Sequence, residues 1–276
     1  MAKRALLIGI NKYMLDGADL RGCVNDVKNM KSVLTTFYGF APKDITVLLD
    51  HAATTKAMKD GISKLVSGAQ KGDTIVLHYS GHGANVPDKN GDEADKRDEI
   101  LCPTDLDWKA PLTDDWLRAT FNKLKAGVNF TVIMDCCHSG TNTRRFRAPD
   151  ERRIPRYLPN PWDLMAVESG RSLRGKRSSV RASSPAKRKK SDAVDAKIDE
   201  LLITGCRDTQ TSADAYIAGS YNGALTYHLV KAIKAAKGKL SYRQLHQRTN
   251  TMLKAGSYDQ VSQLEGRQVK FDRPLL

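Results

Sequence analysis

The sequence has no segment of about 18 consecutive apolar residues, the length that a membrane-spanning helix needs. Its apolar start, Ala5 to Ile10, is shorter than the core of a signal peptide. The five cysteines are scattered and odd in number, so they do not indicate the disulfide framework of a small secreted protein. We therefore expect a cytoplasmic protein that does not bind a membrane.

The signatures of a structural zinc site and of a serine hydrolase are also missing. There is no Cys-x-x-Cys pair, so zinc would need the adjacent Cys136 and Cys137 together with His138 and His82. Adjacent cysteines do not easily reach one tetrahedral ion, which leaves zinc as a minor alternative. Without a Gly-x-Ser-x-Gly segment, the nucleophile turn of a serine hydrolase is excluded.

The formal net charge of +14 is concentrated in one insert. Residues 144–190 hold fifteen Lys and Arg against four acidic residues, a net charge of +11, and five of the ten prolines. Residues 171–190 have almost no apolar side chains, which predicts a disordered loop because burial cannot offset the loss of conformational entropy. The half before them contains Ile154, Tyr157 and Trp162 and could dock on a surface. The charge alone suggests nucleic acid, but its confinement to an insert argues against a folded binding face.

Strand and helix patterns alternate on either side of this insert. Apolar runs predict strands at 5–10, 45–49, 73–79, 130–134 and 201–204, and helical spacing predicts helices at 23–37, 54–67, 113–124, 222–236 and 241–254. Strands that are apolar on both faces are typical of a parallel sheet covered by helices on both sides. We predict one α/β domain, made of residues 1–143 and 199–276, that is interrupted by a basic and largely disordered linker at 144–198.

Polar segments follow two of the predicted strands, where ligands bind in parallel α/β sheets. Ser80–Gly83 follows the strand at 73–79, and Asp135–Gly140 follows the strand at 130–134. If the two strand ends are neighbours, His82 meets a cysteine. An imidazole beside a thiol can act as base and then as acid toward the leaving amine, and the glycines allow backbone N–H groups to approach an oxyanion.

Together with three further segments, these two resemble the motifs of metacaspases and of their bacterial relatives, the orthocaspases. The further segments are Leu20–Asp26, the acidic stretch Gly91–Glu99, and Ser262–Gly266. All five occur in the order that the family has, and the resemblance covers most of the chain. It implies a caspase-like fold and a cysteine endopeptidase that cleaves after Arg or Lys.

Carried over residue by residue, the resemblance implies Cys137 as the nucleophile and His82 as the general base and acid. It also implies that the backbone N–H groups of Gly83 and Cys137 form the oxyanion hole. The alternative interpretation is that Cys136 and Cys137 are both buried thiols of the core, without a catalytic role. Their place after a strand and before Ser-Gly favours one exposed thiol, so we interpret Cys136 as structural, and both His138 and His78 as packing residues.

The resemblance assigns the pocket for the basic side chain of the substrate to Asp26 and Asp135, with Cys23 and Ser80 beside them. Desolvated carboxylates are what a guanidinium or an ammonium group needs for charge-assisted pairing. Asp214 falls where a loop of the small-subunit portion would line this pocket. It is either a further acidic pocket residue or a surface aspartate at the start of a helix.

A calcium site is a further implication of the resemblance, with Asp98, Asp114 and Asp115 as ligands. Arg144 stands where the family has one more aspartate, and a cation there would repel the metal. Asp114 and Asp115 could equally be first-turn acids of the helix after Thr113. We expect no required cofactor, with calcium as a candidate activator.

The basic insert lies between the two portions of the domain, where members of this family are often self-cleaved. An enzyme that prefers basic residues would find its nearest substrate there, at high effective concentration, within 144–190. Protein or peptide substrates with a basic residue before the cut are the expected partners, and the resemblance favours a monomer. We expect no specific nucleic acid, because residues 171–190 offer little aromatic surface for base stacking. The alternatives are an uncleaved solvated loop, or a catalytically silent caspase-like scaffold whose loop binds a polyanion.

Overall fold

The computed structural model describes residues 1–88, 91, 96–138, 152–168, 200–207 and 210–276. Most of the insert, at 144–151 and 169–198, lies outside the described residues, and so does the prediction that 171–190 forms a disordered loop. The same holds for Arg144 and for residues 92–95 of the acidic stretch.

A six-stranded sheet forms the centre of the molecule, with the strand order β12-β9-β7-β3-β1-β2. Its strands are β1 (Lys3–Gly9), β2 (Ile45–Leu49), β3 (Thr74–Ser80), β7 (Asn129–Asp135), β9 (Glu200–Thr204) and β12 (Gln263–Glu265). The first five run parallel, and β12 pairs antiparallel with β9 at one edge. The insert therefore separates β7 from β9, which are hydrogen-bonded neighbours in one sheet.

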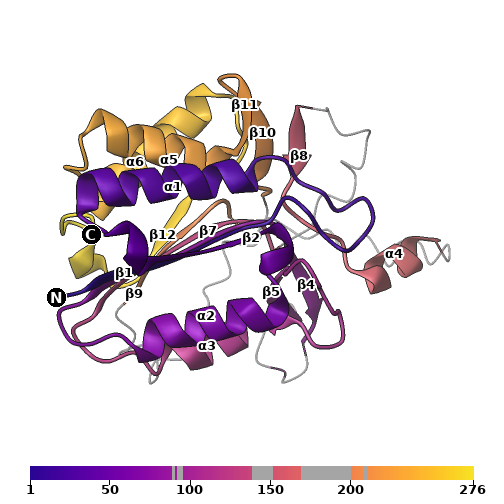
Figure 1. The fold of residues 1–276 in the computed structure, drawn as a ribbon. Coiled ribbons are helices and arrows are strands. Elements are labelled where there is room, and N and C mark those ends of the chain that lie inside the picture. Colours follow the sequence, from indigo (N-terminus) through magenta and orange to yellow (C-terminus); the bar gives the residue numbers. More distant parts are fainter. Residues whose placement is uncertain (89–90, 92–95, 139–151, 169–199, 208–209) are drawn as a thin grey trace.

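Helices cover both faces of this sheet (Figure 1). On one face lie α1 (Cys23–Tyr38), α5 (Ala224–Ala235) and α6 (Tyr242–Ala255), and on the other lie α2 (Thr55–Ser67) and α3 (Asp114–Phe121). Two apolar clusters, one on each face, bury the side chains of β1 and β3. The central sheet is thus predominantly parallel and covered by helices on both faces, as the sequence predicts.

Two small sheets lie at the carboxyl end of the parallel strands, one above and one below the central sheet in Figure 1. One consists of β4 (Gly83–Pro87), β5 (Arg97–Leu101) and β6 (Leu112–Thr113), and the other of β8 (Arg153–Pro155), β10 (Ala213–Ile217) and β11 (Ser220–Gly223). The helix α4 (Pro161–Glu168) projects beside them, and short 3-10 helices lie at Pro42–Asp44, Asp50–Ala52 and Gln268–Lys270.

Local sequence signals explain several element boundaries. The side chain of Thr54 accepts a hydrogen bond from the Ala57 N–H at the start of α2, and Thr113 caps α3 in the same way. A capping box with Ser241 and Gln244 starts α6. Every long element predicted from periodicity is present, with ends shifted by no more than a few residues.

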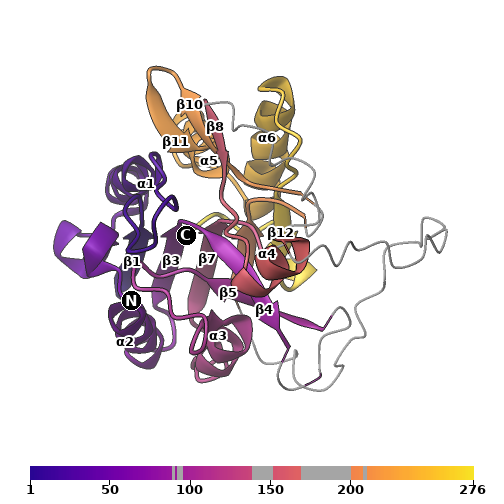
Figure 2. The same cartoon turned by 90° about the vertical axis from the view of Figure 1, so that its right-hand side faces the viewer.

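The described half of the insert is attached to the fold, as its apolar residues allow. The strand β8 pairs antiparallel with β10, and the side chains of Ile154 and Leu158 pack against the core cluster on the α2 face. Figure 2 shows β8 beside β10 and β11, with α4 next to β4 and β5. Among the residues that the structure describes, no helix has both the length and the apolar composition for crossing a membrane.

Acid should destabilise this fold through its buried histidines. Burial lowers the pKa of His78, His82 and His228 to about 4, from an ordinary value near 6.5. Between these two values the unfolded chain takes up protons that the folded chain does not, so the free energy of unfolding falls as the pH falls through this window. Each histidine contributes at most about 1.4 kcal/mol per pH unit.

Urea denaturation between about pH 7 and about pH 4 measures this loss. His228 stacks edge-on against Tyr227 and Tyr258, so phenylalanine at position 228 keeps the ring contacts and removes the titrating group. His228→Phe should lose less unfolding free energy than the wild type over the window. Equal losses in the two proteins would contradict the assignment of this pH dependence to His228.

Candidate active site

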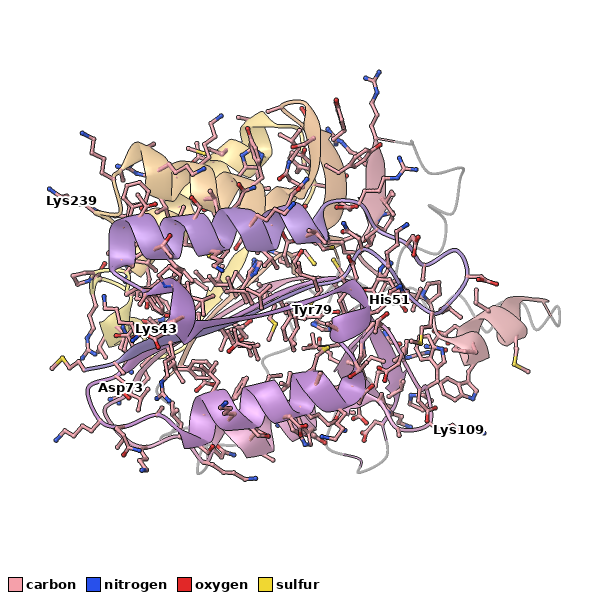
Figure 3. All side chains as sticks on the ribbon, viewed as in Figure 1. Lys43, His51, Asp73, Tyr79, Lys109 and Lys239 are labelled. Carbon is pink, nitrogen blue, oxygen red and sulfur yellow. The ribbon has the colours of Figure 1, made fainter. Side chains whose placement is uncertain are left out.

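The register of β3 on β7 brings the two predicted motifs together. Ser80, the last residue of β3, pairs directly with Asp135, the last residue of β7. The loops that carry His82 and Cys137 therefore begin at neighbouring points on the edge of the sheet. Figure 3 labels Asp73 just before β3 and Tyr79 near its end, which gives the direction of the strand toward the site.

Two backbone N–H groups at this edge donate to one carbonyl oxygen. The N–H of Gly83 and the N–H of Cys137 lie 3.0 Å and 3.2 Å from the carbonyl oxygen of Arg156. A side chain at position 83 would overlap the Cys137 carbonyl group, so only glycine allows this approach. The pair has the geometry of an oxyanion hole, with the carbonyl group of Arg156 in it.

The imidazole of His82 is fixed in one orientation. Its Nε2 lies 2.9 Å from the carbonyl oxygen of Ala18, which accepts only if Nε2 carries the proton, and its backbone N–H donates to the Tyr13 hydroxyl at 2.8 Å. Nδ1 has no hydrogen-bond partner among the residues that the structure describes. Burial lowers the pKa of His82 to about 4, so the ring is neutral near pH 7 and Nδ1 can accept a proton.

The thiol of Cys137 is fully buried and held by two groups of the loop after β9. The backbone N–H of Ser212 donates to Sγ, and the Cys206 thiol lies 3.0 Å from it. Burial, and after it the Cys206 contact, raises the pKa of Cys137 well above its ordinary value. Within the described part of the chain, no hydrogen bond joins Cys137 to His82, and both groups are neutral in the resting state: the thiol is protonated and the imidazole is uncharged.

The other cysteine and histidines of these motifs have packing contacts. Cys136 belongs to the core cluster on the α2 face, and its thiol lies 3.5 Å from Nε2 of His138. The other nitrogen of His138 lies 3.2 Å from the Ile100 carbonyl oxygen. His78 is buried against Thr226, 3.2 Å from its hydroxyl. These positions agree with the structural interpretation of Cys136, His138 and His78.

Three aspartates surround one arginine next to this carbonyl group. The guanidinium of Arg156 lies 2.8 Å from Asp26, 3.0 Å from Asp214 and 3.3 Å from Asp135. All four side chains are completely buried. The guanidinium also donates to the Ser80 hydroxyl at 2.8 Å. The structure thus brings the predicted pocket residues together and adds Asp214 to them, on β10 rather than at the start of a helix.

The carboxylates are held by donors from four separate segments. Asp26 accepts from the Gly223 N–H, Asp135 from the Thr226 N–H, and Asp214 from the Arg21 and Gly22 N–H groups. Three hydroxyl groups add to this set, that of Ser80 on Asp26 and those of Ser212 and Thr226 on Asp135. Because these donors are backbone groups or short side chains, they fix the positions of the carboxylates before a cation binds.

One guanidinium does not neutralise three buried carboxylates. Burial raises the pKa of Asp26 to about 7 against the lowering effect of Arg156, and Asp135 raises it further. Burial lowers the pKa of Arg156, but Asp135 and the other neighbours raise it more, so the guanidinium stays charged. Cys23 lies one turn before Asp26 at the start of α1, where burial raises its thiol pKa. The charge of this cluster is therefore complementary to a strong cation.

Sequence reasoning did not single out Arg156, Cys206 or Ser212. Arg156 is one of many arginines in the insert, and only the docked neighbours Ile154 and Leu158 distinguish its surroundings. Cys206 and Ser212 contact Cys137 from the loop after β9, which lies far from Cys137 in the sequence. A cavity of about 500 Å3 also reaches Cys137 and Cys206, but Asp26, Asp135 and Asp214 do not line it.

The predicted calcium ligands do not form a metal centre among the residues that the structure describes, where no group of three His, Cys, Asp or Glu side chains could hold an ion. Asp98 lies on β5 and is buried, whereas Asp114 and Asp115 start α3. Asp114 forms an ion pair with Arg118 at 3.2 Å. Calcium stays a prediction, tested by peptide cleavage in calcium and in a chelator.

Comparisons with known proteins agree with this geometry. The model of the metacaspase, peptidase C14 domain matches residues 3–144. The chain is 35% identical to Metacaspase-1 of Pyricularia oryzae over 95% of its own length and 71% of that protein. It is 35% identical to Metacaspase-1 of Eremothecium gossypii, of which it covers 63%.

Solved structures give the same result for the fold. The crystal structure of protein GSU0716 from Geobacter sulfurreducens is 30% identical and superposes with a TM-score of 0.71. The match covers 99% of this chain and 97% of that one, so the central sheet, both helical layers and the loops at the strand ends are included. From its sheet, its paired motifs and these matches, the chain belongs to the metacaspase peptidase C14 family of caspase-like cysteine peptidases.

Proposed function

We propose that this protein is a cysteine endopeptidase that cleaves after Arg or Lys, with Cys137 and His82 as its dyad. One observation carries the proposal: Arg156 lies as the residue before a scissile bond would lie. Its side chain is surrounded by Asp26, Asp135 and Asp214, while its carbonyl oxygen accepts from Gly83 and Cys137. A peptide that binds as Arg156 does has its carbonyl carbon beside the nucleophile.

The proposed reaction uses the groups in the order that their positions allow. His82 Nδ1 takes the proton of Cys137, and Sγ attacks the carbonyl carbon. The N–H groups of Gly83 and Cys137 stabilise the negative oxygen that forms. The protonated imidazole then gives its proton to the leaving amine, and water hydrolyses the thioester by the same route. Because Nε2 donates to the Ala18 carbonyl oxygen, the ring stays oriented while Nδ1 changes protonation.

The first substrate in this proposal is the chain itself, at the bond between Arg156 and Tyr157. The backbone of Arg156 donates to the Ser212 carbonyl oxygen at 2.9 Å, and Leu158 donates to the Gly83 carbonyl oxygen at 2.9 Å. The segment is therefore held on both sides of the bond to be cut. A tethered substrate has a high effective concentration, so cleavage within one molecule needs no encounter.

Loss of the nucleophile should abolish activity, and loss of its neighbour should not. Cys137→Ala removes the attacking sulfur, so cleavage of an Arg peptide should fall at least about 1,000-fold. Cys136→Ala leaves Sγ of Cys137 in place and should retain most of the activity. Initial rates with a fluorogenic Arg peptide measure both. A dead Cys136→Ala enzyme beside an active Cys137→Ala enzyme would reverse the assignment of the nucleophile.

Removing one charge from the pocket should weaken cleavage after Arg while leaving the fold intact. Asp26→Asn keeps the shape but loses a charge-assisted bond, worth about 1.5–3 kcal/mol, so kcat/KM should fall about 10- to 150-fold. Asp60→Asn, on the surface of α2, is the matched control. Arg, Lys and Asp peptides are compared in one plate. Faster cleavage of the Asp peptide than of the Arg peptide by the wild type would contradict the basic preference.

Self-processing should give two pieces cut after Arg156. Intact-mass spectrometry of purified wild-type protein is expected to show both, and Cys137→Ala should show one full-length mass. Arg156→Ala should lose this cut, whereas Arg152→Ala should keep it. A single full-length mass for the wild type, equal to that of Cys137→Ala apart from the substitution, would contradict self-processing.

A further inference from the structure

The segment before Arg156 lies on β10 as an added antiparallel strand. Pro155 pairs with Ala213, Ile154 with Asp214 and Arg153 with Ala215. Strand addition of this kind fixes the register of a peptide by backbone hydrogen bonds and leaves its side chains to be selected by subsites. If Arg156 occupies the P1 position of the proposed peptidase, then Arg153 occupies P4.

The guanidinium of Arg153 has a site of its own. It lies 4.6 Å from the centre of the Tyr258 ring, over its face. It also donates to the carbonyl oxygen of Ser257 at 2.9 Å and to that of Gly256 at 3.3 Å. An aromatic face and two carbonyl oxygens are all electron-rich, so together they favour a cation.

The site is built from the end of a helix. Gly256 and Ser257 follow α6 directly, where the helix dipole places negative potential and unused carbonyl groups. The Tyr258 ring is held between His228, 5.7 Å away on an edge contact, and the backbone of Gly256. A Cβ at position 256 would lie 2.7 Å from the ring, so glycine allows Tyr258 to lie close to the helix end.

We propose that Gly256, Ser257 and Tyr258 form an S4 subsite that selects a cationic side chain, arginine above all, three residues before the P1 residue. This inference rests on the proposed function and adds a second basic position to its substrates. The planar guanidinium can lie flat on the ring while its N–H groups reach both carbonyl oxygens, which a lysine ammonium cannot do to the same extent. The preferred substrate then carries the pattern Arg-x-x-Arg, as residues 153–156 do.

The test compares fluorogenic tetrapeptides with one position changed. Self-processed wild-type enzyme is given Arg-Ile-Pro-Arg, Lys-Ile-Pro-Arg and Ala-Ile-Pro-Arg, each with the same coumarin leaving group. We expect kcat/KM for the first to exceed that for the third about tenfold, with the Lys peptide between them. Tyr258→Leu should reduce this ratio toward one, and Tyr258→Phe, which keeps the aromatic face, should retain most of it.

The outcomes separate this inference from the proposed function. Equal cleavage of the Arg and Ala peptides by the wild type would overturn the S4 subsite and leave the P1 preference standing. An unchanged ratio in Tyr258→Leu would also overturn it, because the cation would then be selected elsewhere. Cleavage of neither peptide would overturn the proposed function and the subsite with it. Thermal unfolding of both variants shows whether a changed ratio comes from the site or from a damaged fold.

Discussion

The parallel register of β3 and β7 is the constraint on which the site depends. Ser80 and Asp135 are paired at the ends of these strands, so the loops that follow begin side by side. The N–H groups of Gly83 and Cys137 can therefore reach one carbonyl oxygen. A shift of one residue would turn every side chain of β7 to the other face of the sheet. Asp135 would then leave the pocket, where it meets Asp26 and Asp214 from other elements. The apolar clusters on both faces of the sheet stabilise this register. The same packing therefore determines the fold and the positions of the site residues.

The burial of three carboxylates is the physical basis of the proposed selectivity for a cation. Each would lose much of its hydration free energy without a partner, so the empty pocket must admit water or take up a proton. The raised pKa of Asp26 is a sign of this cost even with a guanidinium present. An aspartate side chain would meet only like charge here, whereas an arginine satisfies three carboxylates and the Ser80 hydroxyl at once. The proposed preference for a basic substrate residue thus rests on the same unfavourable burial, which a cation relieves.

The sequence predicted the long elements, since the apolar periods of β1, β3, β7 and the helices are strong local signals. The short strands β4 to β6, β8, β10 and β11 were not predicted, because each pairs only two to five residues and depends on partners distant in the chain. His82 and Cys137 lie in motifs that follow predicted strands, and the resemblance to the family supplied their roles and the role of Asp26. The position of Arg156 could not be predicted, because its partners Asp26, Asp135 and Asp214 are distant from it in the sequence. No local signal distinguishes it from the other arginines of the insert.

The resting state of the proposed dyad follows from its burial. The side chains of Cys137 and His82 are both buried, which raises the thiol pKa and lowers the imidazole pKa, so an ion pair between them is disfavoured. Proton transfer to Nδ1 therefore has to accompany attack on the carbonyl carbon rather than precede it.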